Sequence, residues 1–399
     1  MKSSDASNRH TIRRAWIIHS LVGLLYACLV CAIFHPWLRP FHQPQRGGPE
    51  LRFRAGDLTP LFSVWTQVAA RSIFERGEWP LWSDHIYCGE PFFAKPQIGV
   101  ISLTTLLCAV LPAQVVATWT FLLHLWIAGM ATYTWCLTVL QLGRLKSAEG
   151  VSITDSLGWL HANHLAAVCG GAVFMLSGLM VEHTMIGHGP IVLVACWTPL
   201  VLRTIGQALI GNRPVRAAAV AGALVAVQLL AGGETMFLYN VVAAALLALA
   251  WLACGRSSGV DRSEVRSPTT ASFGPAMLRL VAIGGIVGAV GFGLAAIKLL
   301  PGLELMPVTN RAGGLALADA AAPIIEFTEP AMLSALTFGS RALHDKTHLF
   351  AVTCVLALVG LIAGWCRRET RWLAVAGALL VCAGVAIAHE LRVASPSEL

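Results

Sequence analysis

Long apolar runs constrain the fold of this chain more than any other feature of its sequence. Residues 15–34 contain no Asp, Glu, Lys or Arg, and comparable runs recur as far as residue 388. About 20 apolar residues in a helix cross the roughly 30 Å of hydrocarbon in a bilayer. Because unpaired backbone groups are costly in lipid, such runs must be helical. The sequence therefore predicts an all-α polytopic membrane protein.

The composition excludes a soluble enzyme. Only 12% of the residues are charged and 56% are hydrophobic, whereas soluble proteins contain about 25% charged residues. The 28 Lys and Arg outnumber the 21 Asp and Glu, which gives a net charge of +7. These basic residues are scattered between apolar runs and form no stripe with interleaved aromatics, so we expect the lipid bilayer as a partner and no nucleic acid.

About nine membrane spans are predicted. The apolar segment 98–111 is not among them, because it would be only about 21 Å long as a helix; we interpret it as re-entrant or interfacial. The nine spans are residues 15–34, 113–140, 164–180, 190–202, 217–230, 236–254, 277–300, 349–365 and 372–388. The first run has features of a signal peptide as well, but no small-residue cleavage site closes it, so we expect an uncleaved span.

Arginines set the predicted orientation, because cytoplasmic connections are rich in basic residues. Residues 1–14 are then cytoplasmic, and residues 15–390 form a single transmembrane domain of a multi-pass protein. Two large loops, 36–97 and 301–347, lie on the outer side, and residues 391–399 form a short tail. Most of the polar residues outside the predicted spans lie on that outer side, so we expect the substrate to bind there.

Asp57 is the acidic residue that stands out in the first outer loop. Apolar residues recur at helical spacing over 57–77, opposite Ser63, Gln67 and Arg71, which predicts a helix lying along the membrane surface. Asp57 begins this helix, where its carboxylate would be held near the membrane. The alternative is a helix cap, since Asp is a favoured N-cap residue.

Other polar residues lie at the outer ends of predicted spans. His183 and His188 occupy one turn and Glu234 another; each faces either a water-filled cavity or open solvent. Lys298 and Arg311 are suited to binding a lipid-linked phosphate, although snorkelling to ordinary headgroups would also explain them.

No cofactor is predicted. The two histidines are too sparse to argue for a metal site by themselves, and a divalent metal is compatible with the sequence but not indicated by it. A Walker loop, a dinucleotide fingerprint and a zinc-protease motif do not occur in a usable context. ATP-driven transport and hydride transfer are therefore not expected.

An ordered set of short motifs resembles the bacterial YfhO-like membrane proteins over about residues 50–390. The motifs are Gly56-Asp57-Leu58, Arg76-Gly77-Glu78-Trp79-Pro80-Leu81-Trp82, Gly89-Glu90-Pro91, Lys95-Pro96-Gln97, Leu176-Ser177-Gly178 with His183 and His188, Cys196-Trp197-Thr198-Pro199, Leu230-Ala231-Gly232-Gly233-Glu234, and Leu300-Pro301-Gly302-Leu303-Glu304 with Arg311. The chain departs from the family at Glu234, where members commonly have a histidine.

That family is similar to the GT-C glycosyltransferases, which transfer sugars from polyprenyl-phosphate carriers outside the cytoplasmic membrane. The resemblance implies a GT-C-like fold and a bacterial enzyme that moves such a sugar to an envelope polymer or lipid. It implies that Asp57 is catalytic, as the general base on the acceptor hydroxyl. It further implies substrate-binding roles for Trp82, Gln97, His183, His188, Glu234, Lys298, Glu304 and Arg311.

The competing hypothesis is a non-catalytic membrane protein that binds or translocates a lipid-linked envelope precursor. Translocation predicts polar residues that continue through the bundle to the cytoplasmic face, whereas a transferase needs them only outside. Few charges lie in the middle of the predicted spans, which favours the transferase.

Overall fold

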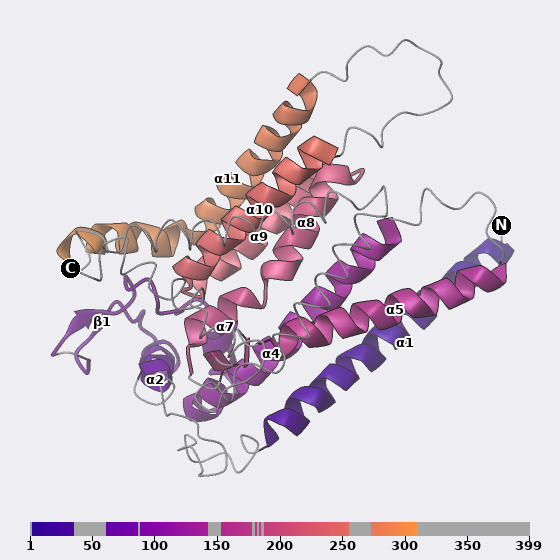
Figure 1. Ribbon diagram of the computed structural model, residues 1–399. Helices are drawn as coiled ribbons and strands as arrows, with labels where there is room; N and C mark the ends of the chain where they lie inside the picture. The colour runs from indigo at the N-terminus through magenta and orange to yellow at the C-terminus, as the bar shows by residue number, and fades with distance from the viewer. Residues whose placement is uncertain are drawn as a thin grey trace, which may run out of the picture.

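A computed structural model describes most of the chain up to residue 309 (Figure 1). The described residues are 2–35, 61–86, 88–142, 153–177, 180–181, 183–184, 187–254 and 273–309. Within them nearly all regular structure is helical, and the only strands are two that form one short hairpin. Asp57, Arg311, the predicted spans 349–365 and 372–388, and the 391–399 tail lie outside the described residues.

The elements follow the apolar pattern of the sequence. In chain order they are α1 (Lys2–Ile33), α2 (Ser63–Ala70), η3 (Arg71–Glu75), β1 (Trp82–Ser83), β2 (Glu90–Pro91), α3 (Leu103–Leu107), α4 (Ala113–Leu142), α5 (Ile153–Met175), α7 (Gly189–Ala195), α8 (Thr198–Ile210), α9 (Pro214–Leu230), α10 (Glu234–Cys254), α11 (Phe273–Leu305) and η5 (Met306–Val308). A proline lies within the first two positions of α7, α8 and α9, where its missing N–H costs nothing.

Four stretches are long and apolar enough to cross a membrane: Trp16–Ile33, Val115–Leu140, Gly189–Ile210 and Gly274–Val308. Three shorter apolar helices are Asn163–Met175, Pro214–Leu230 and Asn240–Leu252. These seven stretches coincide in position with the first seven predicted spans, and a total of nine stays a prediction. Segment 98–111 contains the five-residue helix α3, which is too short to cross, as expected.

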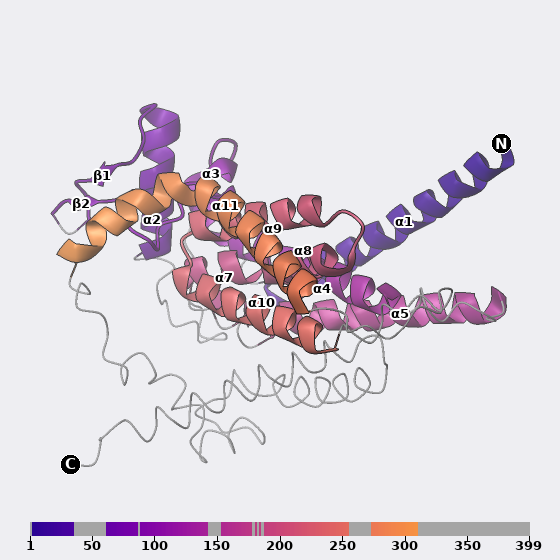
Figure 2. The ribbon, with the colours of Figure 1, turned by 90° about the horizontal axis from the view of Figure 1, so that it is seen from above.

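Two predicted boundaries differ from the structure. Helix α5 ends at Met175 rather than at residue 180. Helix α11 continues through Pro301 to Leu305, so helical backbone extends into the predicted loop 301–347. Pro301 has no N–H for the Ile297 carbonyl, but a proline bends a helix as readily as it ends one. Figures 1 and 2 both show α11 bending, with its last part near the β1–β2 hairpin.

The first helix group consists of α1, α4 and α5, which hydrogen bonds tie together. The indole N–H of Trp126 on α4 donates to the Gly23 carbonyl on α1 at 2.8 Å. The hydroxyl of Tyr26 on α1 donates to the Val168 carbonyl on α5, also at 2.8 Å. A Cβ atom at Gly171 would lie only 2.1 Å from the Tyr26 hydroxyl oxygen. These three helices are therefore fixed in register by close and specific contacts.

The second helix group consists of α8, α9, α10 and α11, and glycines bring α9 and α11 close together. A Cβ atom at Gly222 of α9 would lie 2.8 Å from the Val287 carbonyl of α11. Conversely, a Cβ atom at Gly291 of α11 would lie 2.9 Å from the Val225 side chain of α9. Small residues let helix backbones approach closely where the surrounding solvent is lipid. Figure 1 shows this group diverging from the first group away from the end where α2 and α7 lie.

Candidate functional site

The described part of the first outer loop forms an ordered unit against the ends of several helices. Helix α2 continues as the π-helix η3, so a helix is confirmed over residues 63–75 of the predicted 57–77. Its expected polar side is not uniformly exposed: Ser63 is buried, Gln67 is half-buried and Arg71 is exposed. The reason is that α2 packs against both α3 and α4, so it is covered on more than one side.

Backbone contacts attach this loop to the turn before α10. A Cβ atom at Gly99 would lie 2.5 Å from the Ala231 carbonyl oxygen. Gly232 has φ +88°, and a Cβ atom there would lie 2.7 Å from the Gln97 carbonyl carbon. Only glycine fits both places, because the two backbones touch. Gln97 is thereby placed beside the start of α10, whose first residue is Glu234.

Lys298 joins the same loop to α11 from within the protein. Its side chain is 3% exposed, and its ammonium group donates to the carbonyls of Phe93 at 3.3 Å, Lys95 at 2.7 Å and Ile98. An ammonium group has three hydrogens, and three carbonyls receive them. The predicted phosphate ligand therefore positions residues 93–98 in this structure.

Glu304 lies near the same loop, six residues beyond Lys298 on α11. A Cβ atom at Gly302, two residues before it, would lie 3.4 Å from the Ala94 carbonyl oxygen. Glu304 itself is exposed. Loop 93–99 contains the predicted substrate residue Gln97. It lies close to two others on α11, Lys298 and Glu304.

The two predicted histidines touch each other. The Nδ1 atoms of His183 and His188 are 3.0 Å apart and their ring centroids 5.2 Å apart. One Nδ1 must therefore donate and the other accept. The chain turns back at Gly187, which has φ +85°. A Cβ atom at Gly189 would lie 2.2 Å from the Phe62 ring, so the start of α2 abuts this turn.

Glu90 was missed as a site residue, because the sequence predicts a solvated loop charge there. The β1–β2 hairpin instead buries it to 7% exposure, and its carboxylate accepts a salt bridge from Lys95. Its second oxygen, Oε1, has no hydrogen-bond partner. Ser83 is the partner of Glu90 across the hairpin, and Trp82, which pairs with Pro91, is 56% exposed. The motif Gly89-Glu90-Pro91 was a signal, but only the fold shows that the acid is buried.

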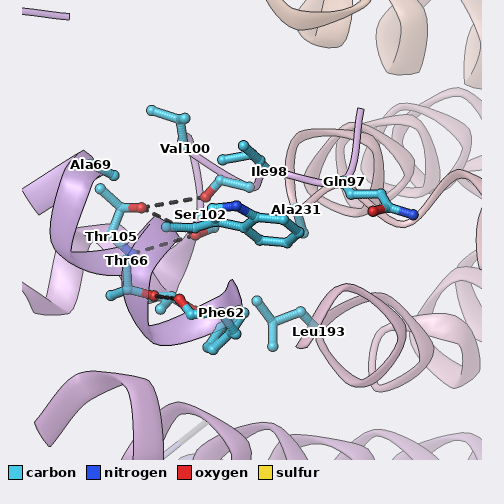
Figure 3. A pocket seen from close by; sticks show the side chains of 13 residues that line it. Phe62, Thr66, Ala69, Gln97, Ile98, Val100, Ser102, Thr105, Leu193 and Ala231 are labelled. Atoms are coloured by element: carbon cyan, nitrogen blue, oxygen red, sulfur yellow. Dashed lines mark hydrogen bonds between the residues drawn. The ribbon is translucent and has the colours of Figure 1, made fainter. Parts of the chain in front are cut away.

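A small cavity with mixed polar and apolar lining lies between α2, α3 and the loop (Figure 3). Its volume of about 20 Å³ is enough for one water molecule. Gln97 lies on one side of it and the hydroxyls of Thr66 and Thr105 on another. Those hydroxyls already donate to the Phe62 and Gly99 carbonyls, at 2.8 and 3.3 Å. The predicted substrate residue Gln97 therefore lines this cavity together with the two hydroxyls.

A larger apolar cavity of about 300 Å³ lies within the second helix group. Side chains of all four helices line it, including Val201 of α8, Val225 of α9, Phe237 of α10 and Val287 of α11. Asn240 is the polar exception. Its amide oxygen accepts from Thr198 at 2.8 Å, whereas its Nδ2 is buried without a partner. The cavity therefore suits a hydrocarbon chain.

The described residues contain no group of three or more His, Cys, Asp or Glu side chains that would hold a metal ion. His183 and His188 supply two nitrogens, and the described part of the chain adds no third ligand of those types. The side chain of Glu234, like Asp57 and Arg311, lies outside the described residues.

No family model, curated protein or solved structure matches this chain. The likeness to YfhO-like proteins, and the activity that it implies, therefore stay predictions.

Proposed function

We propose that this chain is a bacterial membrane glycosyltransferase that moves a sugar from a polyprenyl-phosphate carrier to an envelope polymer or lipid. The reaction takes place at the outer face of the cytoplasmic membrane. The observation that carries the proposal is the attachment of loop 93–99 to α11 and to the turn before α10. This attachment gathers Gln97, Lys298 and Glu304 and the backbone of Glu234 at one end of the bundle.

Asp57 is the proposed general base. The described chain resumes four residues later, at Leu61, and the ring of Phe62 packs against Gly189 beside His188. We propose that Asp57 acts beside this contact. A carboxylate there would take the proton of the acceptor hydroxyl while its oxygen attacks the anomeric carbon and the carrier phosphate leaves.

The leaving phosphate needs a cation to balance its charge. The ammonium group of Lys298 donates to three loop carbonyls, so its contribution is to position the loop and to add positive potential. We assign direct phosphate contact to Arg311.

The apolar cavity supports a polyprenyl phosphate as the carrier of the sugar. It runs along α10 from Phe237, three residues beyond Glu234, and about 300 Å³ is open within it. A prenyl chain in this cavity would leave its phosphate near the start of α10. Cavity and site thus fit one lipid-linked molecule.

The test is transfer of labelled hexose from polyprenyl phosphate by the purified full chain in phospholipid vesicles, with envelope glycolipid extract as the acceptor. Asp57→Asn should abolish transfer, with a loss of about 100-fold or more. Asp84→Asn is the matched control, because Asp84 is an exposed acid of the same loop and should keep full activity. Normal transfer by a folded Asp57→Asn protein would refute the assignment.

A second candidate function is binding or translocation of a lipid-linked precursor without transfer. Buried polar residues along α4 favour it: Thr120 bonds Thr104 of α3 at 2.7 Å, and Thr138 accepts from Arg203 of α8 at 3.0 Å. Polar groups thus reach both ends of α4. Vesicles that move the precursor across the bilayer but release no glycosylated product would support this function over the transferase.

A further inference from the structure

Three helices of the first group each contribute one polar aromatic residue to a single cluster. The hydroxyl oxygen of Tyr133 on α4 lies 3.0 Å from Nδ1 of His19 on α1 and 2.9 Å from Nδ1 of His164 on α5. The Tyr133 side chain is fully buried. One phenol therefore bridges two imidazoles from different helices.

The cluster lies in apolar segments. His19 and Tyr133 belong to helices long and apolar enough to cross a membrane, and His164 belongs to the apolar helix Asn163–Met175. Ionisable groups in such segments are costly and usually serve a function. Tyr26 provides the contrast: it ties α1 to α5 by donating to the Val168 carbonyl. Holding the helices together therefore requires no histidine.

The number of available hydrogens limits which groups of the cluster can donate and which can accept at one time. A phenol has one hydrogen and can donate it to only one imidazole. The other imidazole must carry its proton on Nδ1 and donate it to the phenol oxygen. The two distances, 3.0 and 2.9 Å, are nearly equal. Either direction of donation therefore fits the same geometry.

We propose that His19, Tyr133 and His164 form a proton-transfer relay inside the first helix group, an activity that neither candidate function requires. The relay begins when the imidazole that donates through Nδ1 takes up a proton on Nε2. Its Nδ1 proton then moves to the Tyr133 oxygen while the phenol proton moves to Nδ1 of the other imidazole. That second imidazole releases its Nε2 proton. One proton enters, one leaves, and Tyr133 ends neutral with its hydrogen bonds reversed.

The other titratable and charged groups near the cluster come from the same helices and from α8. Tyr26 interacts with Tyr133, and Cys136 and Cys169 lie near Tyr26; none of the three can carry positive charge. On α8, the cation Arg203 donates to Thr138, five residues beyond Tyr133 on α4. His19 and His164 are both partly exposed, so neither ring is sealed inside the helix group.

The experiment is nitrogen NMR of histidine-labelled full chain in phosphatidylethanolamine–phosphatidylglycerol vesicles over a pH series. We expect one of the two imidazoles to be protonated on Nδ1 and the other on Nε2, and acidification to add a proton shared by both. Tyr133→Phe keeps the ring volume but removes the bridge, so the two histidines should then titrate independently. Proton exchange between them should slow by about 100-fold or more, the scale of a lost acid–base partner.

Tyr26→Phe is the matched control, because it removes a neighbouring hydroxyl bonded only to backbone; it should leave the histidine titrations coupled. His19→Gln supplies a second variant, in which His164 should lose its shared titration. Unchanged coupling in a folded Tyr133→Phe protein, or a His164 titration in His19→Gln identical to that of the parent, would overturn the relay and leave the cluster a structural tie.

Discussion

Side-chain hydrogen bonds from Tyr26, Trp126 and Tyr133 join all three helices of the first group. In the second group α9 and α11 meet through Gly222 and Gly291, and hydrogen bonds from Thr198 and Arg279 join only α8 to α10 and α11 to α8. The difference extends to packing: the second group surrounds a half-open apolar cavity of about 300 Å³. Hydrogen bonds to every helix fix the register of the first group, whereas open space within the second group leaves its helices room to shift. We infer that the first group is the rigid part of the bundle and the second group the part that admits a lipid chain.

The largest expected effect is from Gly171→Val in the first group. The new Cβ would lie 2.1 Å from the Tyr26 hydroxyl oxygen and 2.6 Å from the Gly129 carbonyl oxygen, so α5 must move. We expect a loss of about 3 kcal/mol or more in the free energy of unfolding, measured by denaturation in mild detergent. The control is Gly293→Val, where a Cβ meets nothing within 4 Å. Equal losses in both variants would contradict the close packing.

Gly222→Val makes the corresponding change in the second group. Its Cβ would lie 2.8 Å from both the Val287 carbonyl oxygen and the Val290 side chain. Only 17% of the α11 window is buried, so among the described residues little packs against the outer side of α11. We therefore expect a smaller loss, about 1–2 kcal/mol, in the same assay. A loss larger than that of Gly171→Val would reverse the assignment of the rigid group. Gly206→Val, at an uncrowded site on α8, is the control.

Tyr26→Phe removes one hydrogen bond from the first group without changing its shape. The Val168 carbonyl loses the donor at 2.8 Å, and we expect the protein to lose about 1 kcal/mol of stability. Thermal unfolding in detergent measures the change. A variant as stable as the parent would mean that the polar contacts do not distinguish the two groups.

Replacing both partners of the hydrogen bond between Thr198 and Asn240 in the second group should not destabilise the protein, in contrast to Tyr26→Phe. Their hydrogen bond leaves Nδ2 of Asn240 buried and unpaired. Replacing both by apolar residues, Thr198→Val with Asn240→Leu, should be neutral or stabilise the protein by up to about 1 kcal/mol. Thr198→Val alone leaves the amide unpaired and should destabilise the protein. If the double variant were the less stable of the two, the cavity would depend on this polar contact.

The apolar pattern predicted where the helices lie, because lipid leaves a chain few alternatives to helical structure. It did not predict that α11 runs through Pro301, since the cost of a proline depends on what packs around the bend. Burial of Glu90 was not predictable either. It follows from a hairpin whose strands are two residues long, too short for a periodic signal.

The candidate site was predicted only as separate residues. Gln97, Lys298 and Glu304 were singled out, but the contacts that gather them join positions about 200 residues apart. Local periodicity carries no information on such pairs. The spacing of His19, Tyr133 and His164 gave no signal for the same reason, because each residue comes from a different helix. Asp57 and Arg311 stay predictions.

The anchoring of loop 93–98 by Lys298 has a consequence for biogenesis. The lysine is encoded 200 to 205 residues after the carbonyls that it binds. At typical synthesis rates it leaves the ribosome roughly 10–40 s after the loop does. During that interval the loop lacks its internal cation, and the seven described helices from α3 to α10 must be made before α11 delivers it. Completion of the site is therefore timed by insertion of α11, and a ribosome that stops before residue 298 leaves the site unassembled.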